Sequence, residues 1–521
     1  MKKTIKYKVN KNVHTREINY IPVRYIIAGF ITLFEVLAII AITTAMCYFV
    51  PYFYLAAFAT EIFCVIKIIA SDDNPDYKVP WLLFVLIIPI GGFMLYFLFY
   101  SRTLEKKFRK RLRDLKDNAY SYNSEENLEA LEAEDAAAAS QARMLMNIAE
   151  TGVFSNTKTK FFPLGEDMHK ALLEDLNGAE KFIYMEYFII EDGKFWGSIL
   201  DILKKKAKDG VDVKLLYDDI GCMSTLPGDY CKTLKSYGIE ATPFSRLKGN
   251  ADSEFNNRSH RKITVIDGHI GYTGGVNIAD EYINEVVRFG HWKDTAIRLE
   301  GDAVYELTHL FLIDYGINVK KMPTYIEGLY PKNPKHGVTG YVIPFGDGPR
   351  PIYERQVGKC VIQNMLAYAT RYMWMTSPYL IIDNELCSAI ENAALRGVDV
   401  RIVLPHIPDK RLVFSMTRSF YQRLISAGVK IYEYTPGFIH SKCYVADGRM
   451  AMIGTINLDY RSLVHHFENG VLLYGTETVG AIDEDIRDIF ERSMPVTRDM
   501  LRTNLPTRFL RAVVRIFAPM L

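Results

Sequence analysis

The sequence predicts an α/β protein made of two similar halves, preceded by a hydrophobic N-terminal region. Three observations support this prediction. The stretch His260–Gly268 recurs as His440–Gly448, with the two histidines 180 residues apart (440 − 260). The tetrapeptide Gly-Val-Asp-Val occurs at 210–213 and again at 397–400, and most of residues 25–100 is apolar. The chain therefore contains two copies of one unit behind a separate apolar part.

Each half shows the alternation of strand and helix that is typical of parallel sheets. In the first half, residues 181–190 form an apolar run that predicts a buried strand, 196–208 an amphipathic helix and 211–217 a second strand. The second half repeats this order at 373–382, 385–396 and 398–404. Strand, helix and strand at this spacing predict a parallel βαβ unit in each half.

The repeated stretch predicts a short strand, a tight turn and a second strand. Along a strand, side chains i and i+2 share a face, so the imidazole and the ammonium of each His-x-Lys point the same way. Asp-Gly follows in both copies and is typical of hairpin turns. The second strand, at 270–273 or 450–453, then returns a Gly-x-x-Asn sequence to the same end of the sheet. Each copy thus gathers an imidazole, an ammonium, an amide and glycine-rich backbone.

That set of groups suits a phosphoryl group. Lysine supplies a point charge, asparagine and backbone N–H groups are donors, and histidine is a nucleophile or proton carrier. One His-x-Lys on a strand is common by chance, but two copies that also agree in the turn and in Gly-x-x-Asn are not. The catalytic candidates are His260, Lys262, His440 and Lys442. The phosphate-binding candidates are Asn277, Asn457, Gly274, Gly275, Gly454 and Thr455.

Asp267 and Asp447 complete the repeated pattern seven residues after each histidine. The pattern His-x-Lys-x-x-x-x-Asp, present twice and followed each time by Gly-Gly/Thr-x-Asn, resembles the signature of the phospholipase D superfamily. The chain from about residue 78 to 521 is similar to bacterial cardiolipin synthases. The resemblance adds both aspartates to the catalytic candidates, whereas their place in the turn favours a structural role.

The resemblance implies two phospholipase D-like half-domains that form one active site at their interface, with neither a metal nor a cofactor. One histidine attacks the phosphorus of a phosphatidyl donor and becomes a phosphohistidine. The other protonates the departing alcohol and then deprotonates the acceptor alcohol. Following the family, His260 is expected to be the nucleophile and His440 the acid and base.

A catalytic histidine usually needs a carboxylate to fix its tautomer and stabilise its cation. By the family pattern, Glu468 is expected to orient His440, which it follows by 28 residues (468 − 440). Asp294 is expected to orient His260, which it follows by 34 residues (294 − 260).

The reaction implied by the resemblance moves a phosphatidyl group from one phosphatidylglycerol to another, giving cardiolipin and glycerol. A hydrolase that uses water, or a transferase that uses another alcohol, is the nearest alternative. A non-catalytic membrane scaffold with a relict fold is a more distant one, and the hydrophobic N-terminus disfavours a secreted or cytosolic nuclease. The expected partners are phosphatidylglycerol in the membrane and an anionic lipid surface.

The composition excludes several other classes of function. The formal net charge of +2 is close to neutral, so nucleic acid is not an expected partner. The seven cysteines include no Cys-x-x-Cys and no Cys/His cluster, which argues against a disulfide framework and against a zinc site. Cys443 lies beside Lys442 on the strand face opposite His440, so we expect it to pack in the core.

The first hundred residues predict a basic N-terminal segment, 1–24, and a transmembrane region, 25–100. A span needs about 20 apolar residues, and the runs 25–50, 52–70 and 81–100 give two or three helices. Both flanks of the region are basic, so the positive-inside rule places both in the cytoplasm. The protein is therefore expected in the cell membrane as a multi-pass protein with a cytoplasmic catalytic region.

Composition divides the rest of the chain into five parts. They are a linker, basic and then acidic and helical (101–157), the first half (158–321), a Pro/Gly-rich linker (322–351), the second half (352–500) and a basic amphipathic segment (501–521). The last segment suits an anionic bilayer surface or docking onto the domain. The polar loop 244–257 leads into His260 and predicts either a substrate-selecting element or a tolerated insertion.

Overall fold

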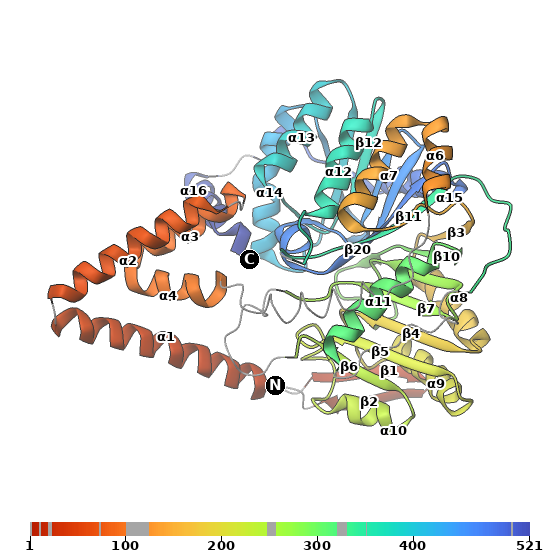
Figure 1. Ribbon diagram of the computed structural model, residues 1–521, viewed down its shortest axis with the longest axis horizontal. Helices are drawn as coiled ribbons and strands as arrows, with labels where there is room; N and C mark the ends of the chain where they lie inside the picture. The colour runs from red at the N-terminus through yellow and green to blue at the C-terminus, as the bar shows by residue number, and fades with distance from the viewer. Residues whose placement is uncertain are drawn as a thin grey trace.

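The computed structural model of the 521-residue chain describes residues 3–9, 12–18, 23–49, 51–71, 74–100, 124–246, 257–319, 331–350, 352–501 and 504–520. Two α/β halves lie one against the other, and an elongated N-terminal arm extends from them (Figure 1). The basic part of the predicted first linker, most of the loop at 244–257 and residues 322–330 of the predicted second linker lie outside the described residues.

The first half is built on a seven-stranded mixed sheet. Its strands lie in the order β3 (Thr157–Phe162), β10 (Ala296–Gly301), β8 (Ile270–Gly274), β7 (Lys262–Ile266), β4 (Phe182–Tyr187), β5 (Asp212–Asp218) and β6 (Glu240–Phe244). β4, β5 and β6 run parallel, and the other neighbours are antiparallel. The predicted βαβ unit is confirmed, with α9 (Lys194–Lys208) as its crossover. This helix buries Trp196, Ile199 and Leu203, the apolar face that its sequence pattern predicts.

The second half repeats this topology with one strand added at an edge. The order is β11 (Tyr341–Asp347), β20 (Glu468–Tyr474), β18 (Met450–Gly454), β17 (Cys443–Ala446), β12 (Tyr372–Thr376), β14 (Asp399–Pro405), β15 (Lys430–Tyr434) and β21 (Ser493–Pro495). Each of the first seven strands runs in the direction of its counterpart. The sequence repeat is therefore a structural repeat.

Helices cover both sheets, and the two halves share part of their core. They are α8 (Gly165–Gly178), α10 (Tyr230–Ser236) and α11 (Val304–Asn318) in the first half, and α12 (Val357–Tyr368), α13 (Asn384–Leu395), α14 (Arg411–Ser426) and α15 (Glu477–Glu491) in the second. Leu307 and Phe311 of α11 pack in one buried cluster with Ile482 and Ile486 of α15 and with strands of both sheets. Burial of these side chains fixes the halves relative to each other.

Two short parallel contacts join the halves where the histidines lie. β9 (His291–Lys293) of the first half pairs with β16 (Gly437–Ile439) of the second. Ser259 forms an isolated parallel bridge with Phe467. Each contact brings the residue before a histidine beside the residue before a carboxylate, which determines the geometry of the site.

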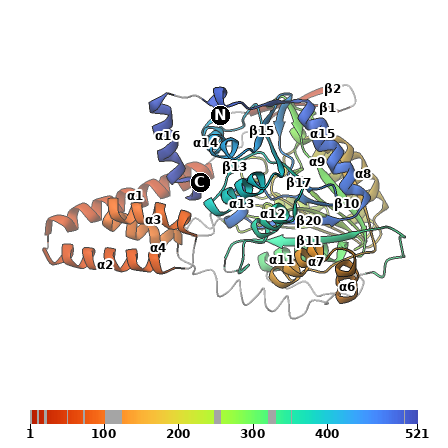
Figure 2. The ribbon, with the colours of Figure 1, turned by 90° about the horizontal axis from the view of Figure 1, so that it is seen from above.

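The N-terminal arm consists of four helices, α1 (Val23–Phe49), α2 (Pro51–Ala70), α3 (Pro75–Ile87) and α4 (Pro89–Tyr100), and it projects from one side in both ribbon views (Figure 2). The apolar run 81–100 is split at Ile88 between α3 and α4, because Pro89 lacks the N–H that would continue the first helix. Within the described ranges, no helix combines the length and the apolar character that a membrane crossing requires. The predicted transmembrane helices are therefore not confirmed.

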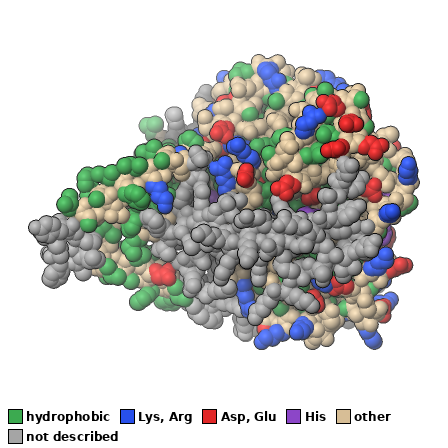
Figure 3. Space-filling model, viewed as in Figure 1, with side chains coloured by type: hydrophobic (Ala, Val, Ile, Leu, Met, Phe, Trp, Pro, Cys, Tyr) green, Lys and Arg blue, Asp and Glu red, His purple; other side chains and the backbone are tan. Residues whose placement is uncertain are grey.

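The arm nevertheless exposes many apolar side chains, which gather in green on its surface in Figure 3. Phe30, Phe34, Leu55 and Ile87 are each about two-thirds exposed or more. The base of the arm docks on the second half, where Asn74 Nδ2 donates to Asp383 Oδ2 at 2.7 Å. Apart from the arm, the strands β1 (Lys3–Val9) and β2 (Asn12–Ile18) form a hairpin within the segment that the sequence predicts only to be basic.

Both predicted linkers contribute to the second half. α6 (Glu125–Glu134) and α7 (Ala136–Ala149) were expected as a solvated connection, but α7 buries Ala138, Ala142 and Leu145 against the second core. The small alanine side chains let this helix pack closely. In the Pro/Gly-rich linker, residues 341–347 form β11, and this edge position tolerates Pro344.

The C-terminal helix α16 (Leu505–Ile516) docks on α14, one of the two expected arrangements. Arg511 Nε donates to Ser415 Oγ at 3.3 Å, and the Arg515 guanidinium lies 4.3 Å from the ring centre of Phe420. Leu505 and Phe509 remain largely exposed. The helix thus carries an apolar surface away from its docking face.

Candidate active site

The two histidines lie at the border between the halves, on backbone held by the parallel contacts described above. His260 N donates to Phe467 O at 2.8 Å, and His440 N donates to Lys293 O at 2.7 Å. Both side chains are buried, each with 7% exposure. Two equivalent backbone contacts between the halves thus carry the two histidines, as expected for a single site at the interface.

Each histidine contacts a carboxylate from the opposite half, which corrects the expected pairing. His260 Nδ1 lies 2.9 Å from Glu468 Oε2 and 3.0 Å from Oε1. His440 Nδ1 lies 2.6 Å from Asp294 Oδ2. The pairing within each half was wrong because Glu468 directly follows Phe467, the bridge partner of Ser259, while Asp294 directly follows Lys293, the partner of Ile439. Sequence separation along one half could not show this exchange.

The exchange fixes the same tautomer in both rings. A carboxylate accepts the proton of Nδ1–H and leaves the lone pair of Nε2 for chemistry. The His260 and His440 rings therefore present Nε2 as the reactive atom, each supported by a carboxylate that is fully buried.

Two buried lysines share the site with the histidines. Lys262 Nζ donates to His260 O at 2.7 Å, and Lys442 Nζ lies 3.1 Å from His440 Nε2. Burial and the neighbouring ammonium lower the pKa of Lys262 to about 7, and burial lowers the pKa of Lys442 to about 8. Two positive groups at this distance from the imidazoles favour an anionic ligand between them.

The same charges keep the imidazoles neutral. Burial, followed by the charges of Lys262 and Lys442, holds the pKa of His260 well below its usual value, and burial with Lys442 lowers that of His440 to about 4. Burial raises the pKa of Glu468 to about 7, against the opposing effect of Lys262. At neutral pH the site therefore holds neutral imidazoles, and the Nε2 lone pair of His260 is in the form required of a nucleophile.

The motif aspartates lie at the far end of the strands, so the structure does not support their inclusion among the catalytic candidates. Asp267 accepts hydrogen bonds from the backbone N–H groups of Glu180, Lys181 and Phe182, at 2.7–2.8 Å. Asp447 does the same for residues 370–372. Both have positive φ, 53° and 54°, as the hairpin turn demands. Seven residues of extended chain place them about 23 Å from the histidines, so they fix the hairpins.

The glycine-rich segments use their backbone donors internally, which differs from the expected phosphate cradle. Gly275 N donates to Thr295 O, Gly454 N to Lys442 O and Thr455 N to Asn469 O. Glycine is needed at 275 for another reason: a Cβ there would lie 2.0 Å from Asp294 Oδ1. Gly274, at φ 149°, faces Thr295 and Ala296 in the same close way. Gly275 thus makes room for the carboxylate that contacts His440, and Gly274 makes room for the chain that follows Asp294.

The two asparagines are not equivalent. Asn277 is satisfied by protein, since Oδ1 accepts from Ile189 N and Nδ2 donates to Tyr282 OH. Asn457 donates to Asp459 Oδ2 at 3.3 Å, and its buried Oδ1 has no hydrogen-bond partner among the described residues. Of the pair, Asn457 retains capacity for a substrate contact.

Three aromatic or imidazole side chains in the site were not predicted from the sequence. Phe188 lies 5.1 Å from the His260 ring, Tyr282 lies 5.4 Å from the His440 ring, and His466 lies 5.6 Å from the His260 ring, measured between ring centres. Of the three, only His466 could have been found from the sequence, because it stands two residues before the candidate Glu468. The others follow strands whose ends the sequence does not align with the site.

Among the described residues, one cluster has metal-ligand character, formed by His260, His466 and Glu468, whose nitrogen and oxygen atoms lie within 4.8 Å of one another. The donor types suit zinc. The neighbouring Lys262 and Lys442 oppose a further cation by charge, and the contacts of His260 are those of a histidine–carboxylate pair.

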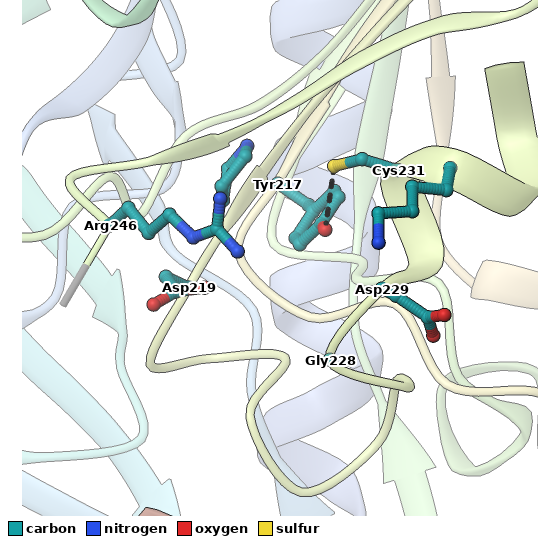
Figure 4. A pocket seen from close by; sticks show the side chains of 8 residues that line it. Tyr217, Asp219, Gly228, Asp229, Cys231 and Arg246 are labelled. Carbon is teal, nitrogen blue, oxygen red and sulfur yellow. Dashed lines mark hydrogen bonds between the residues drawn. The ribbon is translucent and has the colours of Figure 1, made fainter. Parts of the chain in front are cut away.

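A separate small cavity lies at the carboxyl ends of β5 and β6. Tyr217, Asp219, Lys232 and Arg246 are among its lining residues, and Tyr217 OH lies 3.1 Å from Cys231 Sγ (Figure 4). Its acidic and basic side chains balance, and none of the catalytic candidates lines it. It is therefore distinct from the histidine site.

One protein-family profile matches parts of both halves of the chain. The profile described as "Cardiolipin synthase, PLD-like domain" matches residues 172–287 and 362–492, and the profile described as "Phospholipase_D-nuclease N-terminal" matches residues 62–99. The first covers both histidine motifs, and the second covers the later part of α2, all of α3 and nearly all of α4.

Individual relatives extend over most of the chain. A cardiolipin synthase of Halalkalibacterium halodurans is 34% identical over 473 residues, which cover 89% of this chain and 92% of the relative. An uncharacterized protein of Streptococcus mutans is 40% identical over 466 residues, covering 88% and 99%. The crystal structure of a phosphatidylserine synthase of Haemophilus influenzae aligns with a TM-score of 0.55 at 16% identity, over 73% of this chain and 98% of that one. At this identity the structural likeness shows the fold alone.

Proposed function

Since the chain belongs to the cardiolipin synthase family, we propose that it is a phosphatidyltransferase that moves a phosphatidyl group from one phosphatidylglycerol to another, giving cardiolipin and glycerol. The observation that carries the proposal is the pair of His–carboxylate contacts, exchanged between the halves, with two buried lysines beside them. This arrangement supplies a nucleophile, a proton carrier and positive charge at one point.

In the first step of the proposed reaction, His260 Nε2 attacks the phosphorus of the donor, and the bond from phosphorus to the glycerol oxygen breaks. His440 gives its Nε2 proton to that oxygen, so glycerol leaves as a neutral alcohol. The bound phosphodiester anion offsets the charge of Lys442 and so raises the pKa of His440 towards the range in which it can carry a proton.

In the second step, His440 takes a proton from the hydroxyl group of the acceptor. The resulting oxygen nucleophile attacks phosphorus, the phosphorus–Nε2 bond breaks, and His260 is restored. Glu468 and Asp294 hold the two rings and stabilise the positive charge that each acquires in turn. Lys262, Lys442 and the second N–H of the Asn457 amide donate to the phosphoryl oxygens, where negative charge develops.

The N-terminal arm is proposed to hold the protein at the cell membrane, where both lipid substrates reside. Support comes from its exposed apolar side chains, because patches of this kind on a protein surface mark interaction sites. The exposed Leu505 and Phe509 of α16 provide a second apolar surface, suited to an anionic bilayer. A multi-pass arrangement with a cytoplasmic catalytic region stays a prediction, tested by labelling of single cysteines from each side of the membrane.

The proposal is tested by product analysis with purified protein in liposomes that contain labelled phosphatidylglycerol as the sole lipid substrate. Cardiolipin and free glycerol in equal amounts are expected, and both are lost in His260→Ala. Phosphatidic acid without cardiolipin would make the protein a hydrolase. Products that appear only with another added alcohol would identify a different transferase, and no turnover with any donor would indicate a scaffold.

A further inference from the structure

The backbone that carries His260 is held by buried charges, and its counterpart in the second half is not. Three neighbours of His260 each contact a buried carboxylate of the first half. The contacts are Arg258 Nε with Asp218 Oδ2 at 3.0 Å, Ser259 Oγ with Glu186 Oε1 at 2.5 Å and Arg261 Nη1 with Asp314 Oδ2 at 2.8 Å. The positions that correspond in the second half are Phe438, Ile439 and Ser441. Two of these are apolar, and Ser441 Oγ contacts Thr376 Oγ1 at 2.7 Å.

Arg261 connects both members of the His260–Glu468 pair. It is adjacent to His260 in the chain, and its Nε donates to Glu468 O at 3.0 Å. Its Nη2 donates to Tyr353 OH at 3.0 Å and to Asp347 O at 3.2 Å, both in the second half. Arg261 is 1% exposed, and its guanidinium contacts Asp314 of the first half and Tyr353 of the second half.

Two buried carboxyl groups, Glu186 and Asp314, interact electrostatically with Arg261. Burial and the adjacent Asp314 carboxylate raise the pKa of Glu186 well above its usual value. Burial also raises the pKa of Asp314, against the opposing charge of Arg261. Asp314, whose Oδ2 accepts from Arg261 Nη1, is the counter-ion of Arg261, so that neither charge of the pair is left uncompensated.

We propose that Arg261, held by Asp314 and Tyr353, is a positioning residue that aligns the His260–Glu468 pair for attack on phosphorus. The inference rests on the proposed function, because it assigns Arg261 to the formation of the phosphatidyl-enzyme. Displacement of a reacting group by about 1 Å can cost about 10²-fold in rate. The side chain acts through Glu468 and His260 and does not touch the substrate.

The test must separate positioning from simple stability. Arg261→Lys keeps the charge opposite Asp314 but loses the fork that reaches Glu468 O, Tyr353 and Asp347. The double variant Arg261→Met/Asp314→Leu removes both buried charges together, so most of the folding stability that either single change would cost is expected to return. Glu186→Gln replaces the carboxyl group that contacts Ser259 by a neutral isostere. Arg298→Met, which breaks a partly buried ion pair with Asp175 elsewhere in the first half, is the matched control.

For each variant, kcat and KM for phosphatidylglycerol, the single-turnover rate of phosphatidyl-enzyme formation and the melting temperature are measured. Arg261→Lys and the double variant are expected to lower kcat and the single-turnover rate by about 10- to 100-fold while KM changes by less than about threefold. Glu186→Gln and Arg298→Met are expected to stay within about threefold of the parent protein in kcat.

A stable double variant with the kcat of the parent protein would overturn the inference, as would a change confined to KM. A loss in Arg261→Lys that Arg298→Met reproduces would also overturn it, because any ion pair of this half would then have the same effect. Failure of the proposed function has a different signature, namely absence of cardiolipin with the parent protein itself.

Discussion

The two halves have the same strand order and the same histidine motif, yet they support their histidines differently. His260 lies between residues held by buried ion pairs and hydroxyl contacts, and its ring contacts both oxygens of Glu468. His440 follows apolar residues of β16, and its ring contacts one oxygen of Asp294 and the ammonium of Lys442. A duplicated fold thus gives its two histidines unequal surroundings, which fits the two successive roles proposed for them.

The largest expected effect comes from removing each histidine. His260→Ala is expected to abolish the phosphatidyl-enzyme and to lower turnover by about 10⁴-fold or more, because no other Nε2 occupies its place. His440→Ala is expected to lower turnover with phosphatidylglycerol by a similar factor. It should still form the intermediate from a donor with an acidic leaving group, which departs without a proton.

Both variants are incubated with labelled donor, denatured with detergent at neutral pH because a phosphohistidine hydrolyses in acid, and analysed for covalent label. The same covalent yield in both variants with the activated donor would contradict the assignment of roles and would make the halves interchangeable.

The next effect concerns the exchanged carboxylates. Glu468→Gln and Asp294→Asn are each expected to lower kcat by about 10²- to 10⁴-fold, because the ring loses its tautomer and the partner of its cation. In double variants, Glu468→Gln should add little to His260→Gln, while Asp294→Asn should add little to His440→Gln. The rates of the single and double variants, measured with the activated donor, give the coupling energy between each carboxylate and each histidine. Coupling of Glu468 with His440 instead would contradict the exchanged pairing and support the pairing within each half.

This exchange also shows where prediction from sequence reached its limit. The repeat, the βαβ order and the candidate histidines and lysines follow from residue spacing, because periodicity and turn chemistry are local. The partners of the histidines depend on which backbone segments meet across the border between the halves. Nothing local to Glu468 or Asp294 reports the bridges of Phe467 with Ser259 and of Lys293 with Ile439.

Two other differences have equally definite physical causes. The Gly-x-x-Asn segments resemble phosphate loops by composition, but Gly275 is required by the carboxylate of Asp294 packed against it. Residues 136–149 look like a solvated connection because alanine is only weakly apolar, whereas its small volume lets α7 pack closely on the second core. Composition gives the polarity of a segment and not its packing partner.

A smaller effect is expected from pH, and it again distinguishes the halves. The pKa of Lys262, lowered to about 7, lies below that of Lys442, lowered to about 8. As pH rises through these values, the free protein loses positive charge and binds the phosphodiester anion less well. The value of kcat/KM should therefore fall above neutral pH, first through Lys262.

Arginine stays protonated throughout this range, so Lys262→Arg should remove the earlier part of the fall while Lys442→Arg leaves it. Profiles of kcat/KM from pH 6 to 10 for the three proteins provide the measurement. An identical decline in all three would show that neither lysine controls binding.

The smallest effect on catalysis is expected at the motif aspartates, although they belong to the repeated signature. Asp267→Asn and Asp447→Asn each weaken a carboxylate that accepts three backbone N–H bonds, at residues 180–182 or 370–372. Because hydrogen bonds to charged groups contribute about 1.5–3 kcal/mol, each change should lower the free energy of unfolding by roughly that amount. The kcat of the folded fraction should stay within about twofold, since the histidines lie at the other end of the strand. Denaturant unfolding and kcat, measured well below the melting temperature, test both statements. A large loss of kcat without loss of stability would return these aspartates to the active site.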